Sequence, residues 1–243
     1  LKEIYDTIDN TSPGAYVILE HLADNSEEKV LANYGMLLWG NLNHAYCQSS
    51  MGYSQESDFS WISYKNRGWT NPGVVGYMES HDEERLMYNN LLGGNSNTTY
   101  NVKNLNTALA RQETAGMFFF TIPGPKMIWQ FGELGYEFSI NRCEDGTISP
   151  DCRLSRKPIR WDYLDNDLRV NLNTVYSKMI TLKKSHPAIS VPWSGGLTIR
   201  YYRSMPAERK RCLQSPSSTS CCLKTRTVPF RSNHSLFFTR TKS

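Results

Sequence analysis

The sequence lacks the long apolar segment that a membrane protein needs. None of its 243 residues belongs to an apolar run of about 18, the length at which a helix can cross a bilayer. Its six cysteines do not have the spacing of a known metal site. We therefore expect no membrane span and assign no metal ligands.

Acidic residues are almost absent from the end of the chain. Residues 205–243 contain eight Lys or Arg and one acid, whereas the whole chain has 27 basic and 23 acidic residues. The remainder of the chain is therefore slightly acidic. A basic tail can bind nucleic acid, but few aromatic residues accompany these charges and no helix or strand pattern presents them. We expect no nucleic-acid partner.

Two of the cysteines, Cys143 and Cys152, flank a loop that contains glycine and proline. They could close a disulfide if the protein is exported, or they could remain two free thiols. Their spacing does not decide between these alternatives.

Strand-like and helix-like segments alternate along the chain. Apolar periodicity and turn residues predict helices over 1–10, 26–33, 58–66, 104–120 and 166–185, a polar helical segment up to about residue 52, and strands over 15–20, 35–39, 74–79 and 126–131. A further helix is expected to open with Glu83, Glu84 and Arg85 after the third strand. This alternation predicts an α/β fold with a parallel sheet and right-handed crossovers.

Four strands cannot close an eight-stranded barrel, and they leave a bare edge. We therefore expect residues 1–190 to be part of a larger barrel, with residues 1–10 belonging to a helix entered in its middle. Residues 191–243 are expected to begin a C-terminal β domain, with a strand from Leu197 to Tyr202. Beyond about residue 205 we expect disorder or an out-of-frame reading. The bare edge predicts aggregation of the chain when it is expressed alone.

Two strands end abruptly in carboxylates. The apolar segment from Ala15 ends at Glu20, and the segment from Val74 ends in Glu79-Ser-His-Asp82. In a barrel of parallel strands such ends lie on one rim, where catalytic residues gather. A glutamate held partly desolvated can donate a proton, and an aspartate that stays ionised can face a developing oxocarbenium ion. This pair predicts cleavage of a glycosidic bond.

Four motifs, in order, carry a resemblance to the α-amylase family, glycoside hydrolase family 13. Residues 77–82, Tyr-Met-Glu-Ser-His-Asp, are similar to the family segment written F-V-E-N-H-D. Residues 15–20 resemble the strand that carries its general acid. Residues 124–133 resemble its eighth strand, and residues 156–162 resemble the stretch of its last long loop that frames the substrate cleft.

This resemblance implies the second half, strands five to eight, of a (β/α)8 TIM barrel. It implies that Glu20 is the general acid/base, and that Asp82 binds the 2- and 3-hydroxyls of the sugar and stabilises the transition state. His81 is implied as a substrate-binding residue. His21, beside Glu20, and Arg85, at the start of the next helix, are further candidates for sugar contacts, although Arg85 is interpreted mainly as a capping residue of that helix.

The nucleophile of the family does not carry over. The family places it on a strand inside G-x-R-x-D, and this sequence contains no such segment. A retaining mechanism needs that carboxylate about 5–5.5 Å from the acid, so we expect the chain to be inactive alone.

The expected substrates are α-1,4-glucans such as starch and maltooligosaccharides. The alternatives are a transglycosylase or branching enzyme of the same fold, a non-catalytic carbohydrate-binding remnant, and a truncated product without function. The resemblance makes calcium possible but assigns no ligand. The location of the protein is left undecided.

Overall fold

The structure is a computed structural model that describes residues 1–186, 197–203 and 234–240. It divides into two compact units, Leu1–Pro192 and Trp193–Ser243. In the second unit, β5 (Leu197–Arg203) pairs antiparallel with β6 (His234–Arg240). β5 confirms the predicted strand. β6 lies beyond residue 205, where we predict disorder or an out-of-frame reading. The rest of that stretch lies outside the described residues. For those residues the expectation stays a prediction.

The first unit is built on a four-stranded sheet in the order β1-β2-β3-β4, and all of its neighbouring strands are parallel. Its strands are β1 (Ile18–Leu19), β2 (Leu37–Asn41), β3 (Val74–Tyr77) and β4 (Lys126–Met127). The predicted α/β fold with a parallel sheet is therefore confirmed.

Three of the strands are shorter than predicted: β1, β4 and, by two residues at its end, β3. β1 pairs with β2 at Ile18 and Leu19, and β2 is its one neighbour in the described sheet. β4 leaves the ladder after Met127, and the chain turns at Phe131, whose φ of 57° lies in the left-handed region. These differences concern strand ends and leave the predicted parallel pairing unchanged.

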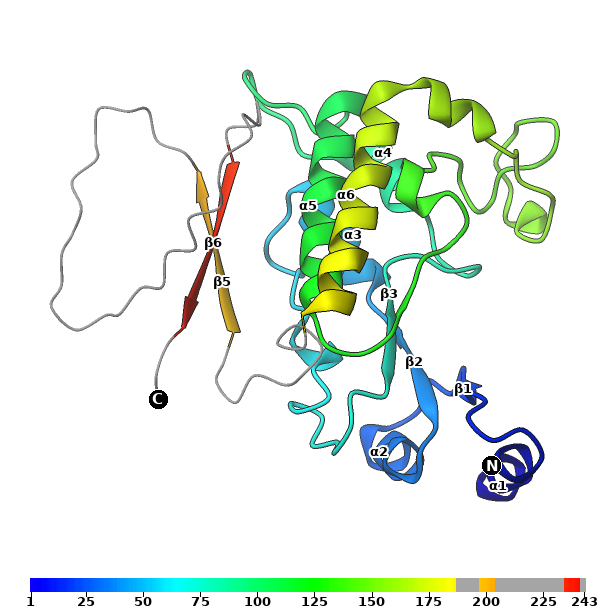
Figure 1. Ribbon diagram of the computed structural model, residues 1–243. Coiled ribbons are helices and arrows are strands. Elements are labelled where there is room, and N and C mark those ends of the chain that lie inside the picture. The colour runs from blue at the N-terminus through cyan, green and yellow to red at the C-terminus, as the bar shows by residue number, and fades with distance from the viewer. Residues whose placement is uncertain (187–196, 204–233, 241–243) are drawn as a thin grey trace, which may run out of the picture. The chain divides into compact units, whose positions relative to one another are not determined.

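The described residues also form six α-helices (Figure 1). They are α1 (Lys2–Thr11), α2 (Asn25–Tyr34), α3 (Asn43–Met51), α4 (Leu86–Gly93), α5 (Leu105–Thr121) and α6 (Asp167–Ser185). Short 3-10 helices cover Ser60–Ile62, Gly132–Leu134, Pro150–Cys152 and Trp161–Asp165.

The helix predicted over 58–66 is wrong, because only Ser60–Ile62 forms a helical turn there. Asp58 accepts hydrogen bonds from the backbone and hydroxyl of Ser60, and such local side-chain bonds compete with helix formation. The helix expected to open at Glu83 begins instead at Leu86.

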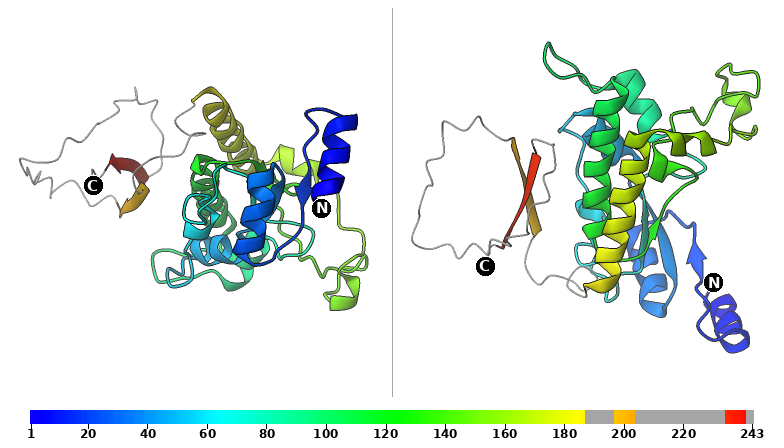
Figure 2. Two further views of the ribbon diagram at one scale, coloured as in Figure 1. Left: turned by 90° about the horizontal axis from the view of Figure 1, so that it is seen from below. Right: turned by 45° about the horizontal axis from the view of Figure 1, so that its top comes forward.

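The long helices α5 and α6 run side by side in both views of Figure 2. They approach closely at Gly116, where an added Cβ would lie 2.5 Å from the Tyr176 ring. The core cluster joins these helices to the sheet, with Leu38, Phe119 and Leu172 fully buried in it. None of the helices among the described residues combines the length and apolarity needed to cross a membrane.

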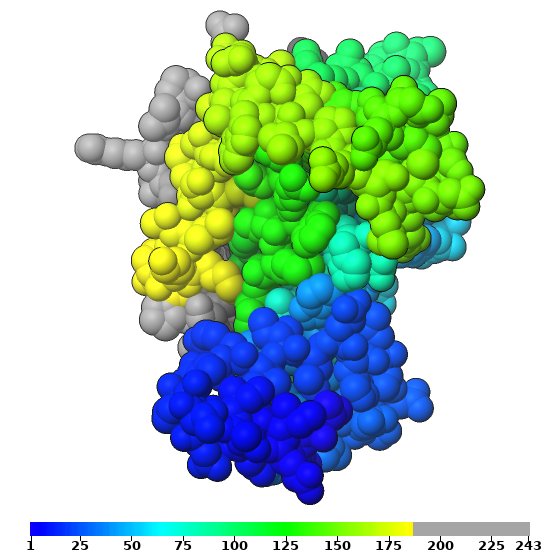
Figure 3. Space-filling model, turned by 90° about the vertical axis from the view of Figure 1, so that its right-hand side faces the viewer, coloured from blue at the N-terminus to red at the C-terminus, as the bar shows by residue number. Residues whose placement is uncertain are grey.

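The N-terminal part of the first unit is the most exposed. None of the residues of α1 is buried, and Figure 3 shows this end (dark blue) as a protruding lobe. The edge strand β1 is preceded by Tyr16, which is 84% exposed, and it includes the exposed Ile18. The predicted aggregation of the chain stays a prediction.

Candidate active site

Glu20, His81 and Asp82 lie together, although β2 separates their two strands in the sheet. Their ligand atoms all lie within 4.8 Å of one another. The Nε2 of His81 is 3.8 Å from a Glu20 oxygen and 3.6 Å from an Asp82 oxygen. The parallel strands β1 and β3 end on the same side of the sheet, which brings these side chains to one rim.

The cluster is open to solvent. The side chain of Glu20 is 46% exposed and that of Asp82 is 50% exposed. The described residues therefore leave the Glu20 carboxylate in contact with solvent, in contrast to the partial desolvation expected from the sequence. The rim therefore carries two carboxylates that both face the Nε2 of one imidazole.

The loop that carries His81 and Asp82 is held in place by a buried strand and by hydrogen bonds at its base. β3 and the following residues 78–80 are buried, so His81 is the first exposed residue after the strand. The Asp82 amide donates to the Ser80 hydroxyl over 3.1 Å. The side-chain amide of Asn43 donates to the backbone carbonyl oxygens of Met78 (2.9 Å) and Glu84 (2.8 Å) and so joins the two ends of the loop. These bonds preorganise the rim.

Aromatic rings flank the imidazole. The centroid of the His81 ring is 5.8 Å from that of Trp39, on β2, and 6.1 Å from that of Trp129, which follows β4. Trp39 also meets Tyr77 edge-to-face at 5.4 Å, and burial raises the pKa of Tyr77. Half-buried aromatic rings beside hydrogen-bonding groups can bind a sugar, because a sugar ring has an apolar face and a polar edge.

Arg85 points away from this cluster, toward Glu79, and its predicted role as a sugar contact stays a prediction. It is only 4% exposed. One of its nitrogens lies 3.2 Å from a Glu79 oxygen and another donates to the Gln130 carbonyl over 2.9 Å. Glu79 also accepts the Leu86 amide at 2.8 Å. Burial raises the pKa of Glu79, and the charge of Arg85 opposes that rise. The pair ties the start of α4 to the sheet.

His21 also lies apart from the cluster. Its Nε2 is 3.1 Å from an oxygen of Glu27, in the first turn of α2. The chain turns directly after it, at Leu22, which has a φ of 47°. No contact in the structure supports the predicted sugar-binding role of His21, and that role stays a prediction.

A disulfide joins Cys143 and Cys152, which decides between the two alternatives that the sequence left open. The next residue, Arg153, donates to the backbone oxygen of Asp82, and the same nitrogen is 3.1 Å from its carboxylate. Sequence reasoning missed this contact, because 71 residues separate the partners and Arg153 belongs to none of the recognised motifs.

Within the described residues, Glu20, His81 and Asp82 form the one group of side chains that could ligate a metal ion. Calcium takes about six to eight oxygen ligands. This cluster supplies two carboxylates and an imidazole, and the guanidinium of Arg153 already lies at Asp82. The donor set does not fit calcium.

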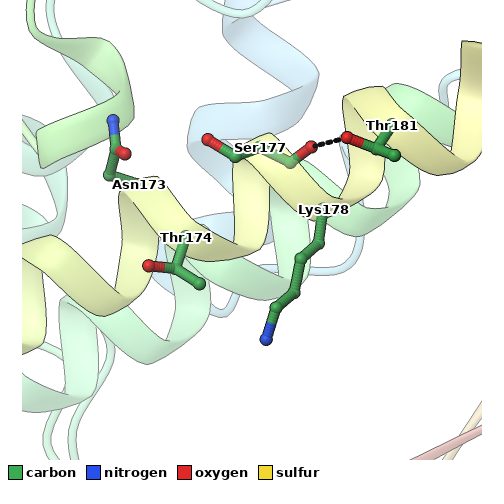
Figure 4. Close-up of a pocket in the computed structure, with 5 residues that line it drawn as sticks. All are labelled: Asn173, Thr174, Ser177, Lys178 and Thr181. Carbon is green, nitrogen blue, oxygen red and sulfur yellow. Dashed lines mark hydrogen bonds between the residues drawn. The ribbon is translucent and has the colours of Figure 1, made fainter.

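A shallow depression on α6 is a weaker candidate for a site. Figure 4 shows the residues that line it, Asn173, Thr174, Ser177, Lys178 and Thr181, along one helix face. The Thr181 hydroxyl donates to the Ser177 carbonyl over 2.9 Å. These described lining residues include no carboxylate, so they cannot supply acid–base catalysis by a carboxylic acid.

Comparison with solved structures identifies the fold. The α-amylase from H. orenii aligns over 82% of this chain and 41% of its own length, with a TM-score of 0.53 and 15% identity. The type III pullulan hydrolase from Thermococcus kodakarensis aligns over 82% and 33%, with a TM-score of 0.54 and 21% identity. The fold is that of the α-amylase family.

Eubacterium rectale Amy13B shares this fold with a TM-score of 0.52 at 12% identity, over 82% of this chain and 41% of its own. The chain therefore spans about two fifths or less of the length of these α-amylase-like structures. No family model matches the sequence, and no curated protein matches it. The resemblance first seen in the motifs is confirmed as a likeness of fold.

Proposed function

We propose that this chain is the second half, strands five to eight, of the catalytic barrel of a retaining glycoside hydrolase that acts on α-1,4-glucans. The observation that carries the proposal is the convergence of Glu20, His81 and Asp82 on one rim of an α-amylase-like sheet. The flanking rings of Trp39 and Trp129 support a sugar as the ligand.

Each member of the cluster has a role in this proposal. Glu20 protonates the leaving oxygen and later activates water, as the acid/base of a retaining enzyme does. Asp82 accepts hydrogen bonds from two sugar hydroxyls and stabilises the oxocarbenium-like transition state. His81, whose Nε2 faces both carboxylates, donates a hydrogen bond to the same sugar.

The proposal needs a third carboxylate to act as nucleophile, about 5–5.5 Å from the acid. The G-x-R-x-D segment in which the α-amylase family carries it does not occur in this sequence. We infer that the side chains described here bind the glucan and that the covalent step requires a strand that carries the nucleophile. Maltoheptaose binding without cleavage is the behaviour expected of this chain.

Maltoheptaose is expected to bind the chain saturably and to change its tryptophan fluorescence, because Trp39 and Trp129 border the site. Asp82→Asn removes a charged hydrogen-bond acceptor, so we expect it to weaken binding about tenfold or more. The control Asp9→Asn, on the exposed face of α1, is expected to leave the affinity unchanged. Fluorescence titration with maltoheptaose measures the affinity of the unmodified chain and of both variants.

Cellohexaose provides the control for substrate class, because its glucose units are joined by β-linkages. The proposal is contradicted if maltoheptaose fails to bind the unmodified chain, or if cellohexaose binds it equally well. It is also contradicted if Asp82→Asn and Asp9→Asn bind maltoheptaose with the same affinity as the unmodified chain.

A further inference from the structure

The segment of residues 139–157 is attached to the β3–α4 loop at two points. Near its start, Glu84 accepts a hydrogen bond from the Ser139 hydroxyl and, over 3.1 Å, from the Ile140 amide. Near its end, Arg153 contacts Asp82. The loop that carries His81 and Asp82 is therefore held between two ends of one segment.

The segment is braced internally close to Arg153. The disulfide joins Cys143 to Cys152, the residue directly before Arg153. The ammonium of Lys157 lies within hydrogen-bond distance of four backbone carbonyl oxygens, those of Arg142 (3.0 Å), Cys152 (2.7 Å), Arg153 (3.4 Å) and Ser155 (2.9 Å). Bonds on both sides of Arg153 thus fix its backbone, which lowers the entropy lost when its side chain meets a partner.

The contact between Arg153 and Asp82 has the geometry of a positioning interaction. One guanidinium nitrogen reaches both the backbone oxygen and a carboxylate oxygen of the same residue. Holding these two oxygens restricts the side-chain rotamer of Asp82. The guanidinium is planar and permanently charged, so the contact is directional. His81 faces the other oxygen of the same carboxylate at 3.6 Å.

We propose that Arg153 is a positioning residue for Asp82 and that the Cys143–Cys152 disulfide holds Arg153 in place. The inference rests on the proposed function, because it concerns the carboxylate that binds the sugar. The oxidised segment then presents Asp82 in the conformation that accepts the sugar hydroxyls, and loss of the disulfide loosens both Arg153 and Asp82.

The affinity of Arg153→Gln for maltoheptaose is expected to fall about three- to tenfold, a modest effect because both partners are half exposed. Arg153→Lys retains the charge and one donor, and we expect it to recover part of the loss. Cys143→Ser combined with Cys152→Ser is expected to weaken binding to a similar extent. Lys184→Gln, which removes an exposed charge on α6, is the control without effect.

A double-mutant cycle separates positioning from general damage to the fold. If Arg153 acts through Asp82, Arg153→Gln adds little to the loss already caused by Asp82→Asn, because interacting residues are not additive. Full additivity of the two losses, or unchanged affinity of Arg153→Gln, overturns this inference and leaves the proposed function standing.

Hydrogen exchange provides a readout that needs no sugar. We expect the amides of residues 80–85 to exchange faster in Arg153→Gln than in Lys184→Gln. If maltoheptaose does not bind the unmodified chain, the proposed function fails, and with it the sugar-binding consequence of the inference. Hydrogen exchange still tests whether Arg153 positions the loop. Equal exchange rates of residues 80–85 in Arg153→Gln and Lys184→Gln overturn that positioning role.

Discussion

Arg85→Met is expected to lower the free energy of unfolding by about 3–5 kcal/mol, because it leaves a carboxylate buried without its partner. The side chains of Arg85 and Glu79 are each only 5% exposed. The substitution also removes the hydrogen bond to the Gln130 carbonyl and the stacking of the guanidinium on Tyr136, at 4.8 Å from the ring centre. Urea denaturation measures the loss.

The loss is expected to depend on pH. Burial raises the pKa of Glu79, and Arg85 is the largest of the effects that lower it. Without Arg85 the folded-state pKa rises further, so the folded protein binds a proton that the unfolded chain releases. Stability then falls as the pH rises from the ordinary range of a glutamate through the folded-state pKa. The destabilisation is therefore smaller at about pH 5 than at about pH 8.

Glu79→Gln provides the matched test of this explanation. Glutamine cannot ionise but retains an oxygen for the Leu86 amide, so the double variant Glu79→Gln with Arg85→Met is expected to be more stable than Arg85→Met alone at about pH 8. Equal losses for Arg85→Met at both pH values, or a double variant no more stable than Arg85→Met, would contradict a buried carboxylate as the cause.

Phe119→Ala is expected to cost about 3–5 kcal/mol of unfolding free energy, because it creates a cavity in the main core. Phe119 on α5 is fully buried. The centroid of its ring lies 5.0 Å from the ring centroid of Phe120 and 5.9 Å from that of Tyr46. It therefore joins α5 to α3. Urea denaturation by circular dichroism measures the change.

Leu92→Ala is the control for this core substitution, since Leu92 lies on α4 and is 65% exposed. We expect it to change the unfolding free energy by no more than about 0.5 kcal/mol. A similar cost for both variants would show that Phe119 does not have the core role that its burial indicates.

The parallel sheet could be predicted from the sequence because its strands are mostly apolar, and β3 shows this most clearly. All four residues of β3 are buried, and a strand buried on both faces reads as a continuous apolar run. The strand ends could not be predicted in the same way. Residues 128–131 look strand-like, yet pairing stops at Met127, and only tertiary contacts decide where a ladder ends.

The cluster of Glu20, His81 and Asp82 could be predicted because parallel strands deliver their ends to one rim. The partners of these residues could not. Arg85 follows the cluster closely along the chain and is therefore a candidate for a sugar contact. Its burial against Glu79 depends on how α4 packs. Arg153 reaches Asp82 only because a distant segment folds back, and no local pattern reports such a contact.

The most direct test of the proposed site is an NMR titration that follows the His81 imidazole while maltoheptaose is added. His81→Asn assigns the signal, and His44, which pairs with Glu56 at 2.7 Å, provides an internal reference. The account predicts that the His81 signals shift saturably with maltoheptaose, that cellohexaose leaves them in place, and that the His44 signals do not move. Unmoved His81 signals, or equal shifts with both sugars, would contradict an α-glucan site at Glu20, His81 and Asp82.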